Sequence, residues 1–239
     1  MIKLSNRLRT VASLVSEGNV FADVGTDHGY VPIYLMQQGK ISRAIAMDIN
    51  RGPLERAKEH IALFGMGDYI ETRLSDGLAA LEVGEAESVL IAGMGGGLVI
   101  HILEAGSEIA AAAKELVLQP QSELERVRRY LDENGYVTDV EDMVFEDGKY
   151  YPMMRVHYAS EKTSQKRTKG CETGYIYGAG LLAQRHPVLL EYLKKEKTTY
   201  CGIYENLKKQ PPSEHIRIRQ REIEAAISQN EEALSYYGE

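Results

Sequence analysis

The stretch Asn19-Val-Phe-Ala-Asp-Val-Gly-Thr-Asp-His-Gly-Tyr30 joins an apolar run to a turn that contains two glycines. The run carries Asp23 and ends at Gly25, and Gly29 precedes an apolar pattern with helical spacing. A strand, a tight turn and a helix start in this order let the backbone approach a nucleotide-like ligand closely. Asp27 stands where a second glycine would face a pyrophosphate, so the stretch does not read Gly-x-Gly-x-x-Gly. A carboxylate there disfavours a dinucleotide and suits the sulfonium and ammonium groups of S-adenosylmethionine.

Two further acidic residues follow apolar runs. Asp48 ends the run Ala44–Asp48, 19 residues after Gly29, where it is placed to bond a pair of ribose hydroxyls. Asp76 and Gly77 follow the next run, and a carboxylate there can accept a hydrogen bond from the exocyclic amine of adenine. Each position alone also fits an ordinary turn without a ligand. Three acidic residues at successive strand ends together predict a nucleoside site.

A glycine-rich segment, Gly93-Met-Gly-Gly-Gly97, follows the apolar run Ser88–Ala92 at the place where open α/β sheets bind ligands. We expect its glycines to allow close packing of a sulfonium and an incoming base. The alternative is a phosphate-binding loop, but the Lys-Ser/Thr of a Walker loop is missing. The Asn/Asp-Pro-Pro-aromatic tetrad common in enzymes that methylate exocyclic amines is missing too. A ring nitrogen such as N1 of adenine has an in-plane lone pair and needs no such tetrad.

Asp27 and His28 are the titratable pair expected nearest the donor. Methylation of a neutral ring nitrogen produces a cationic base, which a carboxylate at about 4 Å would stabilise. Asp27 is therefore the first catalytic candidate. His28 is the second, as a residue that orients the base, although it also fits a turn residue bonded to backbone. The other five histidines and the two cysteines have no ligand spacing, so we predict no metal site and two reduced thiols.

The pattern of residues 1–158 is that of an α/β domain with a doubly wound sheet. It predicts helices at 4–15, 31–38, 52–64, 97–103 and 123–134, and strands at 20–25, 44–48, 69–74, 88–92 and 115–119, with a closing antiparallel hairpin at 136–145 and 151–158. Seven strands with a terminal hairpin are typical of a class I methyltransferase, a Rossmann-like fold. We assign residues 1–158 to this catalytic domain.

Residues 159–239 are predicted to form a second domain. Residues 160–180 read as a polar, glycine-containing loop, and 187–207 and 214–234 as an antiparallel helical hairpin of coiled-coil type. Basic clusters on the two helices suit a phosphate backbone, but they also fit a solvated helix face. Tyrosines in this part, at positions 175, 177, 192, 200 and 204, could stack on bases or pack in the core.

The composition of the 239 residues is that of a soluble globular protein with a net charge of −7. Residues 1–158 hold 15 Lys and Arg against 24 Asp and Glu, whereas residues 159–239 hold 13 against 11. No run approaches the length of a membrane span and no signal peptide is evident, so we expect a cytoplasmic protein. Because the charge is unevenly distributed, a local basic surface that binds nucleic acid is compatible with the negative net charge.

Six motifs taken together resemble the TrmK-type bacterial tRNA (adenine-22-N1) methyltransferases. They are Leu4-Ser-Asn-Arg-Leu8, Ala22-Asp-Val-Gly-Thr-Asp-His-Gly29, Asp48, Asp76-Gly77, Ala92-Gly-Met-Gly-Gly96 and Leu118-Gln-Pro-Gln121. The resemblance spans nearly the whole chain. It implies a methyl transfer from S-adenosylmethionine to N1 of adenine 22 in the D-arm of tRNA, with tRNA as the partner and no obligate protein partner or membrane.

These arguments together predict a set of site residues. The catalytic pair is Asp27 and His28. The predicted cofactor-binding residues are Asp23, Gly25, Thr26, Gly29, Asp48, Ile49, Asp76, Gly77, Ala92, Gly93, Met94 and Gly95. The predicted substrate-binding residues are Arg7, Arg9, Gly96, Gln119, Pro120, Lys194, Lys195, Arg217 and Arg221. Left open are a methyltransferase acting on another RNA base, a small molecule or a protein, and a non-catalytic binding module.

Overall fold

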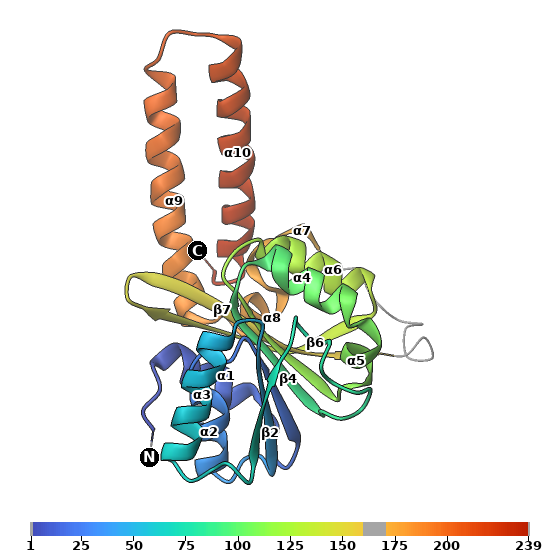
Figure 1. Cartoon of the computed structure of the whole chain (residues 1–239). Helices are drawn as coiled ribbons and strands as arrows, with labels where there is room; N and C mark the ends of the chain where they lie inside the picture. The colour runs from blue at the N-terminus through green and yellow to red at the C-terminus, as the bar shows by residue number, and fades with distance from the viewer. Residues whose placement is uncertain (1, 160–170, 239) are drawn as a thin grey trace. The chain divides into compact units, whose positions relative to one another are not determined.

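The computed structural model describes residues 2–159 and 171–238. The chain forms two compact units that divide between residues 169 and 170. The last strand of the first unit ends at Tyr158, the last residue of the predicted catalytic domain. The two units are described separately below (Figure 1).

The first unit is built on a seven-stranded sheet with the order β3-β2-β1-β4-β5-β7-β6. The first five strands run parallel to their neighbours, and β7 lies antiparallel between β5 and β6. This order confirms the predicted class I methyltransferase fold. The strands are β1 (Val20–Val24), β2 (Arg43–Asp48), β3 (Ile70–Leu74), β4 (Ser88–Met94), β5 (Glu115–Pro120), β6 (Tyr136–Glu146) and β7 (Lys149–Tyr158).

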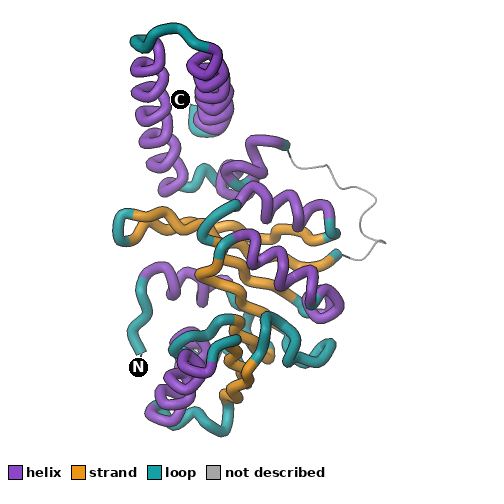
Figure 2. The backbone as a smooth tube through the Cα atoms, turned by 45° about the horizontal axis from the view of Figure 1, so that its top comes forward, coloured by secondary structure: helices purple, strands orange, loops and turns teal. Residues whose placement is uncertain are grey.

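Helices cover both faces of the sheet, so the central strands are apolar on both sides. In β1, Phe21 packs into one core and its neighbour Ala22 into the other. Figures 1 and 2 show the two helical layers with the sheet between them. One layer holds α1 (Asn6–Leu14), α2 (Tyr30–Gln37) and α3 (Arg51–Leu63). The other holds α4 (Gly96–Ala105), α5 (Ser107–Ala112) and α6 (Leu124–Glu133).

Helix α1 is held at both ends, which fixes the position of the side chains it carries. At its start, the backbone N–H groups of Asn6 and Arg7 donate to the Glu146 carboxylate at 2.6 and 3.1 Å. A carboxylate is favourable there because the first N–H groups of a helix have no partner within the helix. Glu146 in turn is positioned by the two-residue hairpin turn Asp147-Gly148, where both residues have positive φ.

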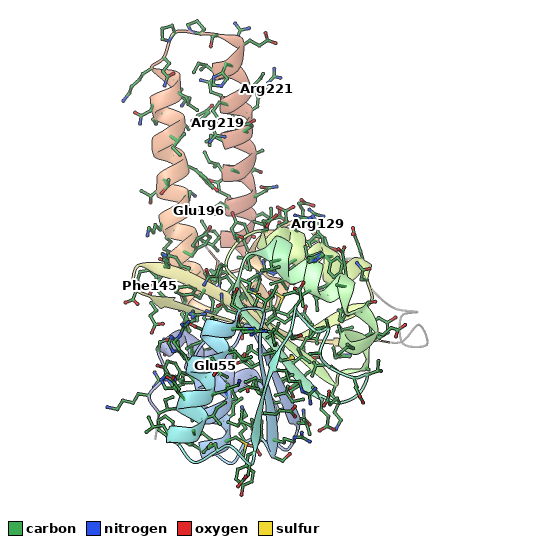
Figure 3. The ribbon with its side chains drawn as sticks, in the orientation of Figure 1. Glu55, Arg129, Phe145, Glu196, Arg219 and Arg221 are labelled. Atoms are coloured by element: carbon green, nitrogen blue, oxygen red, sulfur yellow. The ribbon has the colours of Figure 1, made fainter. Side chains whose placement is uncertain are left out.

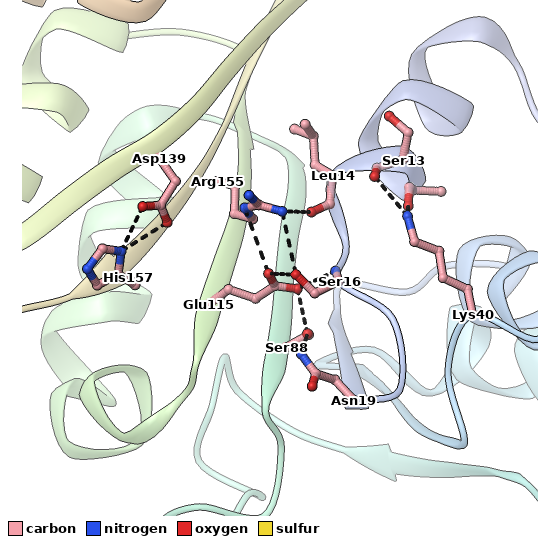
Figure 4. A network of polar contacts seen from close by, with 11 residues as sticks. Ser13, Leu14, Ser16, Asn19, Lys40, Ser88, Glu115, Asp139, Arg155 and His157 are labelled. Carbon is pink, nitrogen blue, oxygen red and sulfur yellow. Dashed lines mark hydrogen bonds and ion pairs between the residues drawn. The ribbon is translucent and has the colours of Figure 1, made fainter.

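The far end of α1 contacts a buried polar network (Figure 4). Glu115 accepts hydrogen bonds from the Ser16 backbone N–H at 2.7 Å and from the Ser16 and Ser88 hydroxyls at 2.6 Å each. The Lys40 ammonium donates to two of the last carbonyls of α1, and Arg155 donates to the Leu14 carbonyl at 3.2 Å. Cations at a helix C-terminus complement its dipole. The network therefore ties α1 to β4, β5 and β7.

The second unit consists of helices α7 (Glu172–Tyr177), α8 (Ala179–Ala183), α9 (Pro187–Lys208) and α10 (Glu214–Ser235). Figure 2 shows α9 and α10 as two long helices joined by a short connection. The predicted hairpin is confirmed in outline: Leu189, Leu193 and Leu207 of α9 and Ile223 and Leu234 of α10 are buried. The other predicted contact positions, Ile203, Ile216 and Ile227, are half-buried.

Three short helices, α5, α7 and α8, were absent from the sequence prediction. The predicted loop over 160–180 is wrong from Glu172 onward, because α7 and the start of α8 lie there; residues 160–170 are outside the described part. Helix α7 buries Thr173, Tyr175 and Tyr177, and these tertiary contacts outweigh the local polarity. Helix α5 was missed because its six residues are too few to show a helical period.

A half-buried carboxylate accepts hydrogen bonds from several tyrosines of this unit. Glu196 of α9, labelled in Figure 3, accepts hydrogen bonds from the hydroxyls of Tyr177, Tyr192 and Tyr200 at 2.6, 2.8 and 3.2 Å. Asn230 of α10 donates to the same carboxylate at 3.0 Å. These contacts join α7, α9 and α10, so these tyrosines have a packing role here.

Candidate active site

The turn after β1 crosses the end of β2 and is fixed by backbone hydrogen bonds. The N–H groups of Gly25 and Thr26 donate to the Met47 carbonyl at 2.8 and 2.9 Å, and the Thr26 hydroxyl donates to Asp23 at 2.6 Å. Gly25 has a φ of +76°, and a Cβ there would lie 2.3 Å from Cε of Met94. Glycine is therefore required at position 25 by both conformation and space.

Asp23 is a buried carboxylate beneath this turn. Burial raises its pKa to about 6, the hydrogen bond from Thr26 opposes the shift, and the nearby negative charge of Asp48 adds to it. A cationic ligand beside Asp23 would favour the ionised form. The geometry therefore suits an ammonium or sulfonium group.

The first of two pockets at this edge of the sheet lies over the ends of β2, β3 and β4; we call it the strand-tip pocket. It has a volume of about 290 Å³. Eight predicted cofactor-binding residues line it: Gly25, Asp48, Ile49, Asp76, Gly77, Ala92, Gly93 and Met94. The sequence prediction missed Val24, Asn50, Ser75, Leu98 and Ile102. Apolar Leu98 is 49% exposed at this pocket, a feature that only the structure shows.

The second pocket lies at the turn itself; we call it the turn pocket. It has a volume of about 380 Å³. Its lining residues are Arg7, Leu8, Asp23, Gly25, Thr26, Asp27, His28, Tyr30, Val31, Leu90, Ala92, Gly93 and Gln121. Both pockets are lined by Gly25, Ala92 and Gly93, so they border each other at these small residues. Two ligands, one in each pocket, could meet there.

Asp27 and His28 both line the turn pocket, and each has partners that the sequence did not reveal. The Arg56 guanidinium donates to one Asp27 oxygen at 2.7 Å, and His28 Nε2 lies 3.4 Å from the other. The ring of His28 stacks with those of Tyr30 and His60, with centroids 5.0 and 5.4 Å apart. His60 Nδ1 also lies 3.0 Å from the His28 carbonyl oxygen. These contacts fix the outer wall of the pocket.

The glycine-rich segment serves packing as well as the pockets. Gly93 has a φ of +79° at an irregularity of β4 and lines both pockets. Gly96, predicted to bind substrate, is buried instead: a Cβ there would lie 2.5 Å from the Ser122 carbonyl oxygen. Gly95 approaches the same segment and lines neither pocket, and Gly29 packs against Ala57 of α3. The sequence indicates that these positions need a small residue, but it does not show which neighbouring residue packs against each glycine.

Arg7 reaches the turn pocket from α1. Its guanidinium donates to the Gln119 side-chain oxygen at 2.7 Å and lies over the Tyr151 ring, 5.5 Å from the centroid. Gln119 is fully buried, and neither it nor Pro120 lines the turn pocket or the strand-tip pocket; Gln121 lines the turn pocket. Gln119 therefore contacts the site through Arg7. Arg9 is exposed and donates to Asn6.

The sequence matches the methyltransferase domain family over residues 4–154, more than half of the chain. It is 34% identical over 222 residues to the tRNA (adenine(22)-N(1))-methyltransferase of Bacillus subtilis, covering 93% of each chain. The chain belongs to the TrmK methyltransferase family.

Solved structures support the same membership. The crystal structure of the Bacillus subtilis m1A22 tRNA methyltransferase TrmK superposes with a TM-score of 0.84 at 32% identity, covering 98% of this chain and 100% of that one. Sp1610 of Streptococcus pneumoniae, solved in complex with S-adenosyl-L-methionine, superposes with a TM-score of 0.84 at 30% identity, covering 97% and 100%. The TrmK fold therefore extends over both units of this chain.

The four predicted substrate contacts of the second unit lie on the long helices of this TrmK-family enzyme. Lys194 and Lys195 are exposed on α9, and Arg217 and Arg221 are exposed on α10. Figure 3 shows Arg221 together with Arg219, which pairs with Glu222 at 2.7 Å. A role for these residues in binding RNA stays a prediction.

Within residues 2–159 and 171–238, no helix has the length and apolar character needed to cross a bilayer. In the same ranges, no group of three or more His, Cys, Asp and Glu side chains is arranged to hold a metal ion.

Proposed function

We propose that this enzyme transfers the methyl group of S-adenosylmethionine to N1 of adenine 22 in tRNA. The observation that carries the proposal is the pair of pockets that border each other at Gly25, Ala92 and Gly93. One pocket has the acidic groups a nucleoside needs, and the other has room for a base beside the transferable methyl. The 34% identity to a tRNA (adenine(22)-N(1))-methyltransferase supports the choice of acceptor.

The donor occupies the strand-tip pocket in this proposal. Asp48 accepts from the ribose hydroxyls, and Asp76 accepts from the exocyclic amine of adenine. Asp48 already accepts from the Asn50 N–H at 2.8 Å, which orients its carboxylate. The methionine part extends past Gly25 to the edge of the turn pocket at Asp23, where the buried carboxylate faces its positive charge. Ile49 and Leu98, both about half exposed, supply apolar contacts to the adenine.

The acceptor adenine occupies the turn pocket. N1 lies on the Watson–Crick edge, so the base must be unpaired or extruded before it can react. The N1 lone pair attacks the methyl carbon in line with the carbon–sulfur bond, whose electron pair returns to sulfur. No proton leaves N1, so no general base is needed, and positioning does most of the work. The positive charge moves to the base, where Asp27 is the nearest candidate to stabilise it, with His28 orienting the ring.

The RNA backbone is held by basic side chains in this proposal. Arg7 at the turn pocket and Arg9 on the same helix bind the nucleotides around the target adenine. Lys194, Lys195, Arg217 and Arg221 on the long helices bind phosphates elsewhere on the folded RNA, in keeping with shape recognition. We propose a cytoplasmic location for the enzyme, which a tRNA substrate supports.

The test is incubation of the full chain with labelled S-adenosylmethionine and an unmodified tRNA transcript that carries adenine at position 22. Nucleoside mass spectrometry should detect N1-methyladenosine, and a matched transcript with guanine at position 22 should stay unlabelled. Asp48→Ala serves as the enzyme control, because loss of charged ribose bonds, each worth about 1.5–3 kcal/mol, weakens donor binding. A different methylated nucleoside, or equal labelling of both transcripts, would contradict the proposal.

A further inference from the structure

A third pocket lies beside the strand-tip pocket, between the segment after β3 and helices α4 and α5; we call it the side pocket. Its volume is about 170 Å³. It is lined by Asp76, Gly77, Leu78, Ala79, His101, Ile102, Ala105, Gly106 and Ile109. Asp76, Gly77 and Ile102 line the strand-tip pocket as well. The two pockets therefore border each other at the residues proposed to hold the adenine edge.

The lining of the side pocket suits an uncharged apolar group. Ala79, Ala105 and Gly106 have small side chains or none, and a Cβ on Gly106 would lie 2.7 Å from Leu78. Asp76 and His101 are the titratable side chains among the lining residues. A cavity of about 150 Å³ lined by aliphatic side chains accepts benzene. The volume of the side pocket is therefore sufficient for one aromatic ring.

We propose that the side pocket is a subsite for a substituent on the exocyclic nitrogen of adenine. It would accept N6-alkyl and N6-benzyl derivatives of S-adenosyl ligands, while the nucleoside stays in the strand-tip pocket. A singly substituted amine keeps one N–H to donate to the Asp76 carboxylate. The substituent replaces the other hydrogen and enters the side pocket at the border that the two pockets share. This inference rests on the proposed placement of adenine against Asp76.

The experiment is a calorimetric titration of the full chain with S-adenosylhomocysteine and with its N6-benzyl derivative. We expect the benzyl derivative to bind with a dissociation constant within about tenfold of the parent, a difference of about 1.4 kcal/mol or less. Ala105→Leu fills the side pocket from α4. This variant should bind the benzyl derivative about tenfold or more weakly than the wild type does. Its dissociation constant for the parent should stay within about twofold of the wild-type value.

Two further variants serve as controls. Ala79→Leu fills the same pocket from the other side, and Ala183→Leu makes the same change at an exposed position of α8 in the second unit. Ala79→Leu should again weaken binding of the benzyl derivative selectively, and Ala183→Leu should change the affinity for neither ligand. Thermal unfolding of each variant confirms folding.

The outcomes separate this inference from the proposed function. If wild type binds the parent but binds the benzyl derivative more than about a hundredfold more weakly, the side-pocket inference is overturned alone. The same holds if neither blocking variant discriminates between the ligands. If wild type binds neither ligand, the inference falls together with the proposed cofactor placement.

Discussion

The Asp27 carboxylate accepts a hydrogen bond from the Arg56 guanidinium at 2.7 Å, which links the turn after β1 to helix α3. Asp27 has a φ of +47°, so a residue with a side chain adopts a conformation that usually favours glycine. The carboxylate proposed to face the developing cation is thus held, and partly neutralised, by a cation that the sequence did not identify. This relationship leads to the first prediction.

Asp27→Ala should lower turnover at saturating donor by more than about tenfold, or about 1.4 kcal/mol of barrier. Asp27→Asn should recover little if charge is what matters. If both variants change only the Michaelis constant of the donor, Asp27 belongs to cofactor binding.

Arg56→Met should lower turnover by about threefold. The half-exposed ion pair with Arg56 stabilises the orientation of the Asp27 carboxylate by about 0.2–1 kcal/mol. In the Asp27→Ala background the same change should have no further effect, which a double-mutant cycle measures. Lys58→Met breaks another exposed pair on α3, with Glu55, and should leave turnover unchanged. Additive effects of the Asp27 and Arg56 changes would show that Arg56 does not act on turnover through Asp27.

Donor binding should depend on pH through Asp23, whose burial raises its pKa to about 6. The ionised form is the one that suits a cationic ligand, so affinity should be constant above about pH 7 and fall as the pH drops through 6. At pH 5 about a tenth of the sites would be ionised, which predicts an affinity about tenfold lower. Calorimetry across this range tests it, and Asp23→Asn should remove the dependence. A flat profile in the wild type would exclude Asp23 as the group involved.

The same residue should affect stability in the opposite direction. Because the folded-state pKa of Asp23 is raised, its ionisation destabilises the fold, and the free energy of unfolding should fall as the pH rises from about 4 to about 6. Asp23→Asn should therefore be more stable than the wild type at pH 7, by about 3 kcal/mol at most. The Asn oxygen can still accept from Thr26, which keeps the turn intact. A lower melting temperature for this variant at pH 7 would contradict the argument.

Gly96→Ala should destabilise the first unit, because the new Cβ would meet the Ser122 carbonyl at 2.5 Å and Val127 at 2.9 Å. We expect a loss of about 2 kcal/mol or more, read as a lower melting temperature. Gly67→Ala is the matched control, since a Cβ at that glycine has no neighbour within 4 Å. Unchanged stability together with weaker tRNA binding would contradict this packing argument and support the predicted substrate-binding role of Gly96.

Replacing Lys194, Lys195, Arg217 and Arg221 by Gln should weaken tRNA binding and leave the affinity for the donor unchanged. Each lost phosphate contact reduces the slope of log affinity against log salt by about 0.9 or less, since folded RNA has both paired and unpaired parts. Lys208→Gln is the control, because Lys208 is a basic residue of α9 outside the predicted substrate-binding set. An unchanged salt slope in the fourfold variant would leave these helices without a role in RNA binding.

The amino-acid sequence alone predicted the seven strands and the longer helices in their order along the chain, and it brought three residues of the candidate site together. Asp48, Asp76 and Gly93 could be assigned to one pocket from sequence, because the carboxyl ends of neighbouring parallel strands meet at one edge of the sheet. Gly25 could be recognised because a strand that turns at once into a helix needs a positive φ. These are local or periodic features, and a period of two or 3.6 is visible in sequence.

The tertiary structure decided which partner each of these residues has. Arg56 lies 29 residues from Asp27, and Gln119 lies 112 residues from Arg7, yet each pair is joined by a hydrogen bond. Gly96, predicted from sequence to bind substrate, packs against Ser122, because a glycine shows that space is limited but not what fills it. Contacts between residues far apart in the chain depend on how helices pack on the sheet, and this packing has no period in the sequence.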